Sequence, residues 1–121
     1  YKRQGLHKVT SFYQRDMDVT DLGFMVGETP LDDINQISLD EKGVSCGTGD
    51  SFVSSNQALQ TDLVDMEAYA IAKVCLINKL DFMCFKFISD NADTEAGDNW
   101  LKNMSLGKNF FRDKILSLFN K

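Results

Sequence analysis

The chain has 121 residues, 43% hydrophobic and 26% charged, which is typical of one globular domain. Its net charge of -5 without clustered Lys and Arg argues against nucleic acid or an anionic membrane as a partner. His7 is the single histidine and the cysteines follow no ligand spacing, so we expect no metal and no cofactor. Cys46, Cys75 and Cys84 are odd in number and widely spaced, and no signal peptide or membrane-length apolar run is visible. These features favour free thiols in the cytoplasm.

The first half of the chain predicts short strands joined by polar loops. β-Branched and aromatic residues at positions 9–13 indicate a strand. Positions 14–40 are polar and without clear periodicity, which is typical of a functional loop. Positions 43–49 predict a second strand entering a glycine-rich turn, and positions 63–64 predict a brief third strand.

The second half of the chain predicts helices around one buried strand. Positions 66–78 carry apolar residues at helical spacing. Positions 82–88 are almost continuously apolar, which favours a strand buried on both faces of an α/β sheet, with Ser89 and Asp90 at its carboxyl end. Strands alternating with helices predict an α/β layer fold in a single domain spanning 1–121. Asp98 is expected to cap a final helix, whose apolar stripe comprises Trp100, Leu101, Met104, Phe111, Ile115, Leu118 and Phe119.

Three carboxylates stand at the boundaries of these elements. Glu67 begins a helix, Asp90 ends the apolar strand, and Asp93 follows in the same loop. Cleavage of an N-glycosidic bond requires a proton for the leaving base and stabilisation of a ribosyl cation. One carboxylic acid can supply the proton, and a second carboxylate can bind the ribose hydroxyls. Asp90 is the candidate acid and Glu67 the candidate ribose ligand.

Each of these residues also has a plain structural interpretation. Glu67 can satisfy the helix dipole, and Ser89 with Asp90 can form a capping or turn pair. Phe52 can belong to the core, and Gly47-Thr48-Gly49 is a weak phosphate-loop signal when taken alone. Local reasoning therefore leaves a plausible acid site with no assigned substrate.

Three segments in a fixed order are more specific than their parts. They are Cys46-Gly47-Thr48-Gly49-Asp50-Ser51-Phe52-Val53, Val64-Asp65-Met66-Glu67-Ala68 and Lys86-Phe87-Ile88-Ser89-Asp90-Asn91-Ala92-Asp93. Together with Asp16-Met17-Asp18-Val19-Thr20, they resemble the methylthioadenosine/S-adenosylhomocysteine nucleosidases of the nucleoside phosphorylase superfamily. The resemblance implies a three-layer α/β fold with flanking helices, of which this chain is the C-terminal part without the N-terminal part. The implied reaction is hydrolysis of adenine from 5′-methylthioadenosine or S-adenosylhomocysteine.

The resemblance implies a role for each residue around the scissile bond. Asp90 would hydrogen-bond or protonate N7 of adenine, with Ser89 in support. Glu67 would bind the ribose hydroxyls, and Met66 would line the sugar.

The same resemblance implies the surroundings of the base and of the 5′ substituent. Phe52 would stack on the base, the backbone of Val53 would read the adenine edge, and Trp100 would lie over the ligand. Leu22 and Pro30 would close the pocket of a neighbouring subunit, which predicts a homodimer.

Some positions depart from the pattern of the resembled family. Lys86 stands where many members have Arg, Asp65 where Glu is common, and Leu22 where an aromatic residue is common. The family's water-activating glutamate has no matching motif in positions 1–15. We therefore expect a preceding segment to supply that group, or this chain to bind without turnover.

Two other functions stay open at this point. A purine nucleoside phosphorylase would use phosphate in place of water. A non-catalytic nucleoside-binding module would keep the pocket and lack the reaction.

Overall fold

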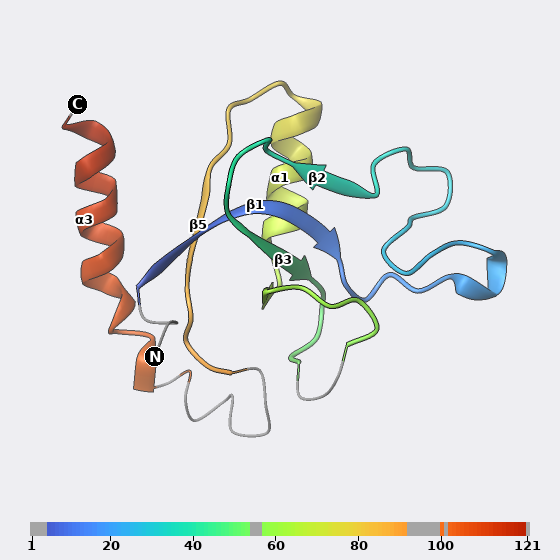
Figure 1. Ribbon diagram of the computed structural model, residues 1–121, viewed down its shortest axis with the longest axis horizontal. Coiled ribbons are helices and arrows are strands. Elements are labelled where there is room, and N and C mark those ends of the chain that lie inside the picture. Colours follow the sequence, from blue (N-terminus) through green and yellow to red (C-terminus); the bar gives the residue numbers. More distant parts are fainter. Residues whose placement is uncertain (1–4, 54–56, 92–99, 101, 121) are drawn as a thin grey trace.

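The computed structural model describes residues 5–53, 57–91, 100 and 102–120. A curved mixed sheet is flanked by helices, which confirms the predicted α/β class (Figure 1). The strands follow the order β2-β1-β3-β4, and β5 also pairs with β1. β3 and β4 run parallel to their neighbours, whereas β2 and β5 run antiparallel to β1. The elements are β1 (Leu6–Gln14), η1 (Thr20–Leu22), β2 (Gln36–Ser38), β3 (Val44–Thr48), β4 (Leu63–Asp65), α1 (Ala68–Ile77), β5 (Cys84–Phe87) and α3 (Gly107–Phe119).

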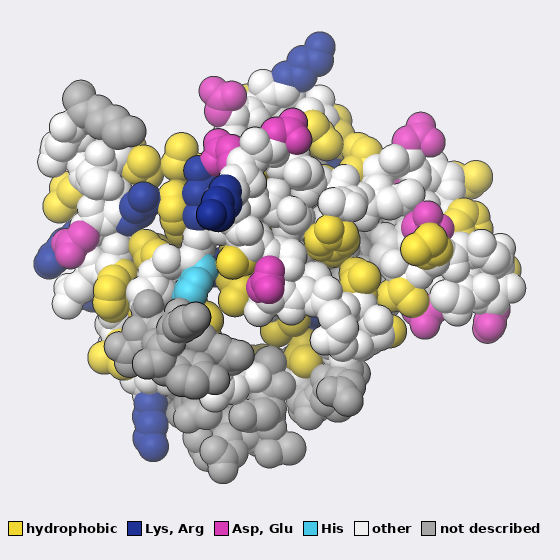
Figure 2. Space-filling view, viewed as in Figure 1, with side chains coloured by type: hydrophobic (Ala, Val, Ile, Leu, Met, Phe, Trp, Pro, Cys, Tyr) yellow, Lys and Arg dark blue, Asp and Glu magenta, His cyan; other side chains and the backbone are white. Residues whose placement is uncertain are grey.

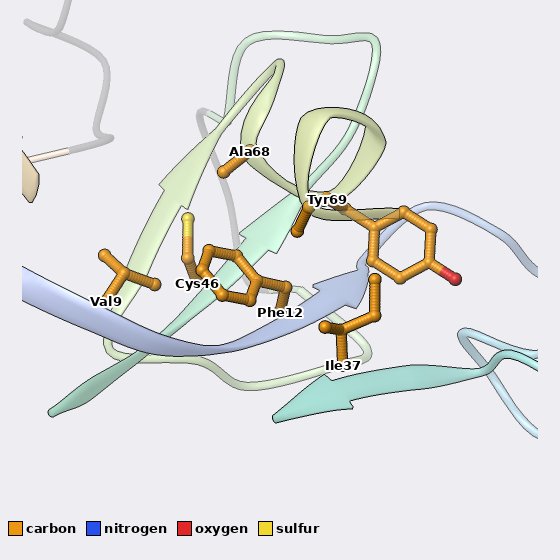
Figure 3. Close-up of a cluster of buried hydrophobic side chains, with 7 residues drawn as sticks. Val9, Phe12, Ile37, Cys46, Ala68 and Tyr69 are labelled. Carbon is orange, nitrogen blue, oxygen red and sulfur yellow. The ribbon is translucent and has the colours of Figure 1, made fainter. Parts of the chain in front are cut away.

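The core lies between the middle of the sheet and α1. Val9 and Phe12 of β1 and Cys46 of β3 are fully buried. Ala68 and Tyr69 of α1 cover them, as Figure 3 shows. Burial of β-branched and aromatic side chains on this face explains why β1 is the central strand. The core thereby fixes the ends of β3 and β4 against the beginning of α1.

Two strand predictions need correction. Positions 36–38, expected to be loop, form β2, with Phe12 opposite Ile37. Burial of Ile37 against the core outweighs the polar residues around it. β5 is half-buried along its length and is not covered on both faces. Among the described residues it pairs only with β1, so its apolar composition did not imply a central position.

The predicted final helix is interrupted. Positions 104–106 form a turn, and α3 begins at Gly107. The amide of Leu106 donates to the carbonyl of Asn103, three residues earlier, which tightens the chain at the break. Gly107 lies close against the ring of Phe87, where a Cβ would lie only 3.0 Å from the ring carbons. Asp98, the expected cap, and Leu101, from the expected stripe, lie outside the described residues.

The expected apolar stripe of α3 is mostly not buried. Phe111, Ile115 and Phe119 are exposed, whereas Leu118 is half-buried. Contact with β5 is made by Phe110, which stacks on Phe87, and by Lys114, which lies over Phe85. Lys and Phe pair because a ring face attracts a cation.

Candidate functional site

One cavity of about 390 Å³ opens at the ends of β4 and β5, beside the first residues of the loop that follows β3. Its volume falls in the range of roughly 300–1,000 Å³ that is typical of small-molecule sites. The seven residues predicted to bind or act on the substrate all line it: Phe52, Val53, Met66, Glu67, Ser89, Asp90 and Trp100. They come from separate stretches of the chain, so the fold brings together what the sequence keeps apart. Their individual roles stay predictions.

The turn from β4 into α1 presents Glu67 to the cavity. Glu67 is the N-cap residue of α1, and its side chain caps no helix amide. That task belongs to Asp65, whose Oδ2 accepts from the amide of Ala68 at 2.9 Å. Glu67 thus makes no capping hydrogen bond, and its place at the helix N-terminus remains compatible with the predicted interaction with the helix dipole. Its carboxylate is 64% exposed, so it is available to a ligand.

Asp65 and Lys86 form an ion pair next to Glu67. Lys86 Nζ is 2.5 Å from Asp65 Oδ2 and 3.7 Å from Glu67 Oε2. Burial opposes charge on both Asp65 and Lys86, but their mutual hydrogen bond and attraction outweigh it. The pKa of Asp65 is therefore lowered, with help from the hydroxyl of Thr48, and the pKa of Lys86 is raised. Both side chains carry charge at neutral pH, so Lys86 is a fixed cation next to Glu67.

Ser89 and Asp90 follow directly after β5. The hydroxyl of Ser89 donates to Asp90 Oδ2 at 2.9 Å, and both residues are half-buried. The side-chain amide of Asn103 donates to the carbonyl of Ser89 at 2.8 Å. These bonds orient the Asp90 carboxyl at the cavity wall, where it can exchange a proton with a bound heterocycle. Asp93, the other carboxylate of this loop, lies outside the described residues.

Two aromatic side chains from separate segments of the chain line the cavity. Phe52 is 66% exposed although it is large and apolar, so it is not a core residue. Trp100 is 41% exposed, and Val53 beside Phe52 is buried. An exposed ring beside carboxylates is suited to stacking on a planar heterocycle.

Sequence reasoning missed some residues that line the same cavity. Arg15 is the most notable, because it is 4% exposed and follows β1, far in sequence from the other residues that line the cavity. Asp62 and Asn91 also line the wall, and Lys86 was noted only as a departure from the family pattern. No local pattern marked Arg15, since its place depends on how β1 and β3 pair.

Leu22 and Pro30 lie elsewhere, on the long loop between β1 and β2. Neither lines the cavity of its own chain. Leu22 is 70% exposed and Pro30 is half-buried. Their predicted contact with a neighbouring subunit stays a prediction.

The described part of the chain holds no group of three or more His, Cys, Asp or Glu side chains suited to a metal ion. In the same residues no helix has the length and apolar character needed to cross a membrane. The described part of the site is thus a cavity of carboxylates, aromatic rings and one ion pair.

Comparison with protein families identifies the class of protein to which this chain belongs. The family model described as "Phosphorylase superfamily" matches residues 30–116, so the chain belongs to the phosphorylase superfamily. The match spans β2 through most of α3 and includes all of the predicted cavity residues.

Individual relatives are 5′-methylthioadenosine/S-adenosylhomocysteine nucleosidases. One from Glaesserella parasuis is 26% identical over 92% of this chain and 59% of its own length. One from Buchnera aphidicola is 30% identical over 82% of this chain and 52% of its own length. The chain thus spans about half the length of the curated relatives that it matches.

Solved structures show the same fold. A 5′-methylthioadenosine/S-adenosylhomocysteine nucleosidase from Helicobacter pylori, solved with butyl-thio-DADMe-Immucillin-A, superposes with a TM-score of 0.72 and 18% identity, covering 95% of this chain and 62% of that one. A futalosine hydrolase mutant from the same species superposes with a TM-score of 0.70 and 22% identity, covering 83% and 54%. At these identities the likeness concerns the fold alone.

Proposed function

We propose that this chain carries the base- and ribose-binding part of an N-ribosyl hydrolase that releases adenine from 5′-substituted adenosines. The observation that carries the proposal is the single cavity in which Asp90, Glu67 and Phe52 meet from three separate segments. The names of the curated relatives support the same reaction for the whole protein. They also support 5′-methylthioadenosine and S-adenosylhomocysteine as the substrates to test.

In the proposed reaction the substrate bridges the two carboxylates. Asp90 hydrogen-bonds or protonates N7, so the adenine leaves as a neutral base rather than as an anion. Glu67 accepts from the ribose hydroxyls and opposes the positive charge that develops on the ribosyl ring. The ammonium group of Lys86 attracts the carboxylate of Glu67. The water that attacks the sugar requires a further general base.

The base would be held by the loop after β3 and by Trp100. Phe52 would stack on the ring plane, and the backbone of Val53 would meet the adenine edge. Met66 would pack on the sugar. Phe52 is exposed in the described structure, which fits a side chain that a ligand covers.

Substitution of the proposed acid tests the reaction. Asp90→Asn keeps the shape and the contact with Ser89 but removes the titratable proton, so adenine release from 5′-methylthioadenosine is expected to fall by about 10²–10⁴-fold. Asp113→Asn is the matched control, because Asp113 lies exposed on α3. A measurable rate of adenine release that is the same in Asp90→Asn and in the unsubstituted protein would disprove the assignment of the acid.

The same assay separates the remaining functions. Adenine release that requires phosphate would identify a phosphorylase. Calorimetric binding of 5′-methylthioadenosine without any release would identify a nucleoside-binding module. Glu67→Gln is expected to weaken binding of the nucleoside while leaving binding of free adenine unchanged.

We also propose that the protein acts as a homodimer in the cytoplasm. In the dimer, the loop that carries Leu22 and Pro30 would close over the 5′ substituent in the neighbouring subunit. Cys46, Cys75 and Cys84 are all free thiols, which fits a reducing compartment.

A further inference from the structure

The loop that follows β3 carries Phe52 and Val53, and it is held by the residues that follow β1. The amide of Arg15 donates to the carbonyl of Thr48 at 2.9 Å. The carboxylate of Asp16 accepts from the amide of Asp50 at 2.6 Å. Two consecutive residues thus join the end of β1 to the beginning of the loop.

The guanidinium of Arg15 extends this attachment across the loop. Its Nη1 donates to the side-chain carbonyl of Gln57 at 3.1 Å, and its Nη2 donates to the backbone carbonyl of Ser51. Arg15 thereby contacts the loop on both sides of Phe52 and Val53. Planar geometry lets one guanidinium reach two acceptors at once, which a lysine ammonium on a flexible stem does not reproduce.

Burial of the Arg15 guanidinium costs free energy. Arg15 is 4% exposed, and among the described residues its Nε has no hydrogen-bond partner. A buried charge with an unused donor is costly, so its presence beside the cavity calls for a functional explanation.

The glycines of Gly47-Thr48-Gly49 provide the space that Arg15 occupies. A Cβ on Gly49 would lie 2.7 Å from Cζ of Arg15 and 2.6 Å from Oδ2 of Asp16. A Cβ on Gly47 would lie 3.0 Å from Cβ of Arg15. The motif therefore makes room for a side chain that follows β1, which is a different role from binding phosphate.

We infer that Arg15 is a positioning residue, which holds the loop of Ser51, Phe52 and Val53 so that its backbone selects a 6-aminopurine over a 6-oxopurine. The inference rests on the proposed function. A 6-aminopurine offers a donor at N6 and an acceptor at N1, whereas a 6-oxopurine offers the reverse pair. A backbone edge held in one place discriminates between them, and a loop free to shift accommodates both.

Binding of the two free bases tests this inference. Calorimetry with adenine and with hypoxanthine is run on the unsubstituted protein, Arg15→Gln and Arg15→Lys. Both variants are expected to bind adenine at least roughly tenfold more weakly and to lose much of the preference for adenine. Arg112→Gln is the matched control, since Arg112 is exposed on α3, and it is expected to behave as the unsubstituted protein.

A milder variant keeps the test decisive if Arg15→Gln does not fold. Gln57→Ala removes one acceptor of Arg15 from a half-buried position, and a smaller loss of the adenine preference is expected. An unchanged ratio of adenine to hypoxanthine affinity in folded Arg15 and Gln57 variants would overturn the inference, even if their melting temperatures fell. Failure of the unsubstituted protein to bind either base would instead disprove the proposed function, and the inference with it.

Discussion

At the scale of single residues, Asp65 and Lys86 form a charged pair in the wall of the cavity. The Asp65 side chain is 8% exposed and accepts from Lys86, from Thr48 and from the amide of Ala68. Because each charge compensates the other, removal of either side chain leaves its partner without its nearest opposite charge. The family resemblance implies that Glu is common at position 65 and that many members have Arg at position 86. The shorter acid and the lysine found here still meet at 2.5 Å.

This pair predicts how stability depends on pH. The folded pKa of Asp65 lies below its usual value, so its contribution is present above about pH 4 and is lost as the pH falls through the folded pKa. The pKa of Lys86 is raised, so its contribution persists to above about pH 10 and is lost as the pH rises further. Asp65→Asn is expected to cost about 1–3 kcal/mol of unfolding free energy at pH 7.

Urea unfolding between pH 3 and pH 7 measures this prediction, with roughly pH 4 as the point where the effect of Asp65→Asn should begin to shrink. The exposed Asp113→Asn serves as control and is expected to show little effect across the range. A cost of Asp65→Asn that does not vary with pH would contradict the assigned ion pair.

At the scale of elements, the beginning of α1 is held by side chains of two neighbouring strands. Thr48 of β3 accepts from the amide of Tyr69 at 2.9 Å and donates to Asp65 Oδ1 at 2.5 Å. Asp65 of β4 caps the amide of Ala68. Two helix amides that would otherwise lack partners are satisfied in this way. The position of Glu67 at the cavity follows from this capping.

Substitution of Thr48 by valine tests the role of the cap. The change keeps the shape but removes the acceptor of the Tyr69 amide, so we expect a loss of about 1–2 kcal/mol in unfolding free energy. Thr20→Val on exposed η1 is the matched control and should change stability by less than about 0.5 kcal/mol. Equal midpoints for the two variants in urea would show that Thr48 does not cap α1.

At the scale of the whole molecule, the loop between β1 and β2 extends away from the core with apolar side chains exposed. Met25 is 72% exposed and Leu31 is fully exposed. Figure 2 shows hydrophobic side chains on the surface of this loop, on the right of the view. Leu31 also has a positive φ of 63°, a conformation that is strained for leucine. Exposed apolar surface on a loop is typical of a protein interface, which supports the proposed dimer.

An aspartate in this loop tests the dimer. Leu22→Asp adds charge to the exposed loop, so we expect the dissociation constant of the dimer to rise by roughly tenfold or more, about 1.4 kcal/mol. Sedimentation velocity over a range of protein concentrations measures it. Leu116→Asp is the control, because Leu116 is an exposed leucine on α3, on the opposite side of the molecule in Figure 1. Monomers at all concentrations in the unsubstituted protein would refute the dimer.

The sequence by itself determined the elements whose signals are local. The strands at 44–48 and 63–65 and the helix at 68–77 were predicted to within a few residues, because β-branched, glycine and helical patterns act over short distances. The residue types also pointed to two candidate carboxylates, whereas Phe52 was placed beside them only by the family resemblance.

Only the tertiary structure decided which side chains form ion pairs and hydrogen bonds between those elements. The contact of Thr48 with the beginning of α1, the pairing of β2, the exposed stripe of α3 and the position of Arg15 all depend on how distant segments pack. The reason is physical: a strand pattern specifies local conformation, whereas a buried charge is placed by whichever acceptors the packed neighbours present to it.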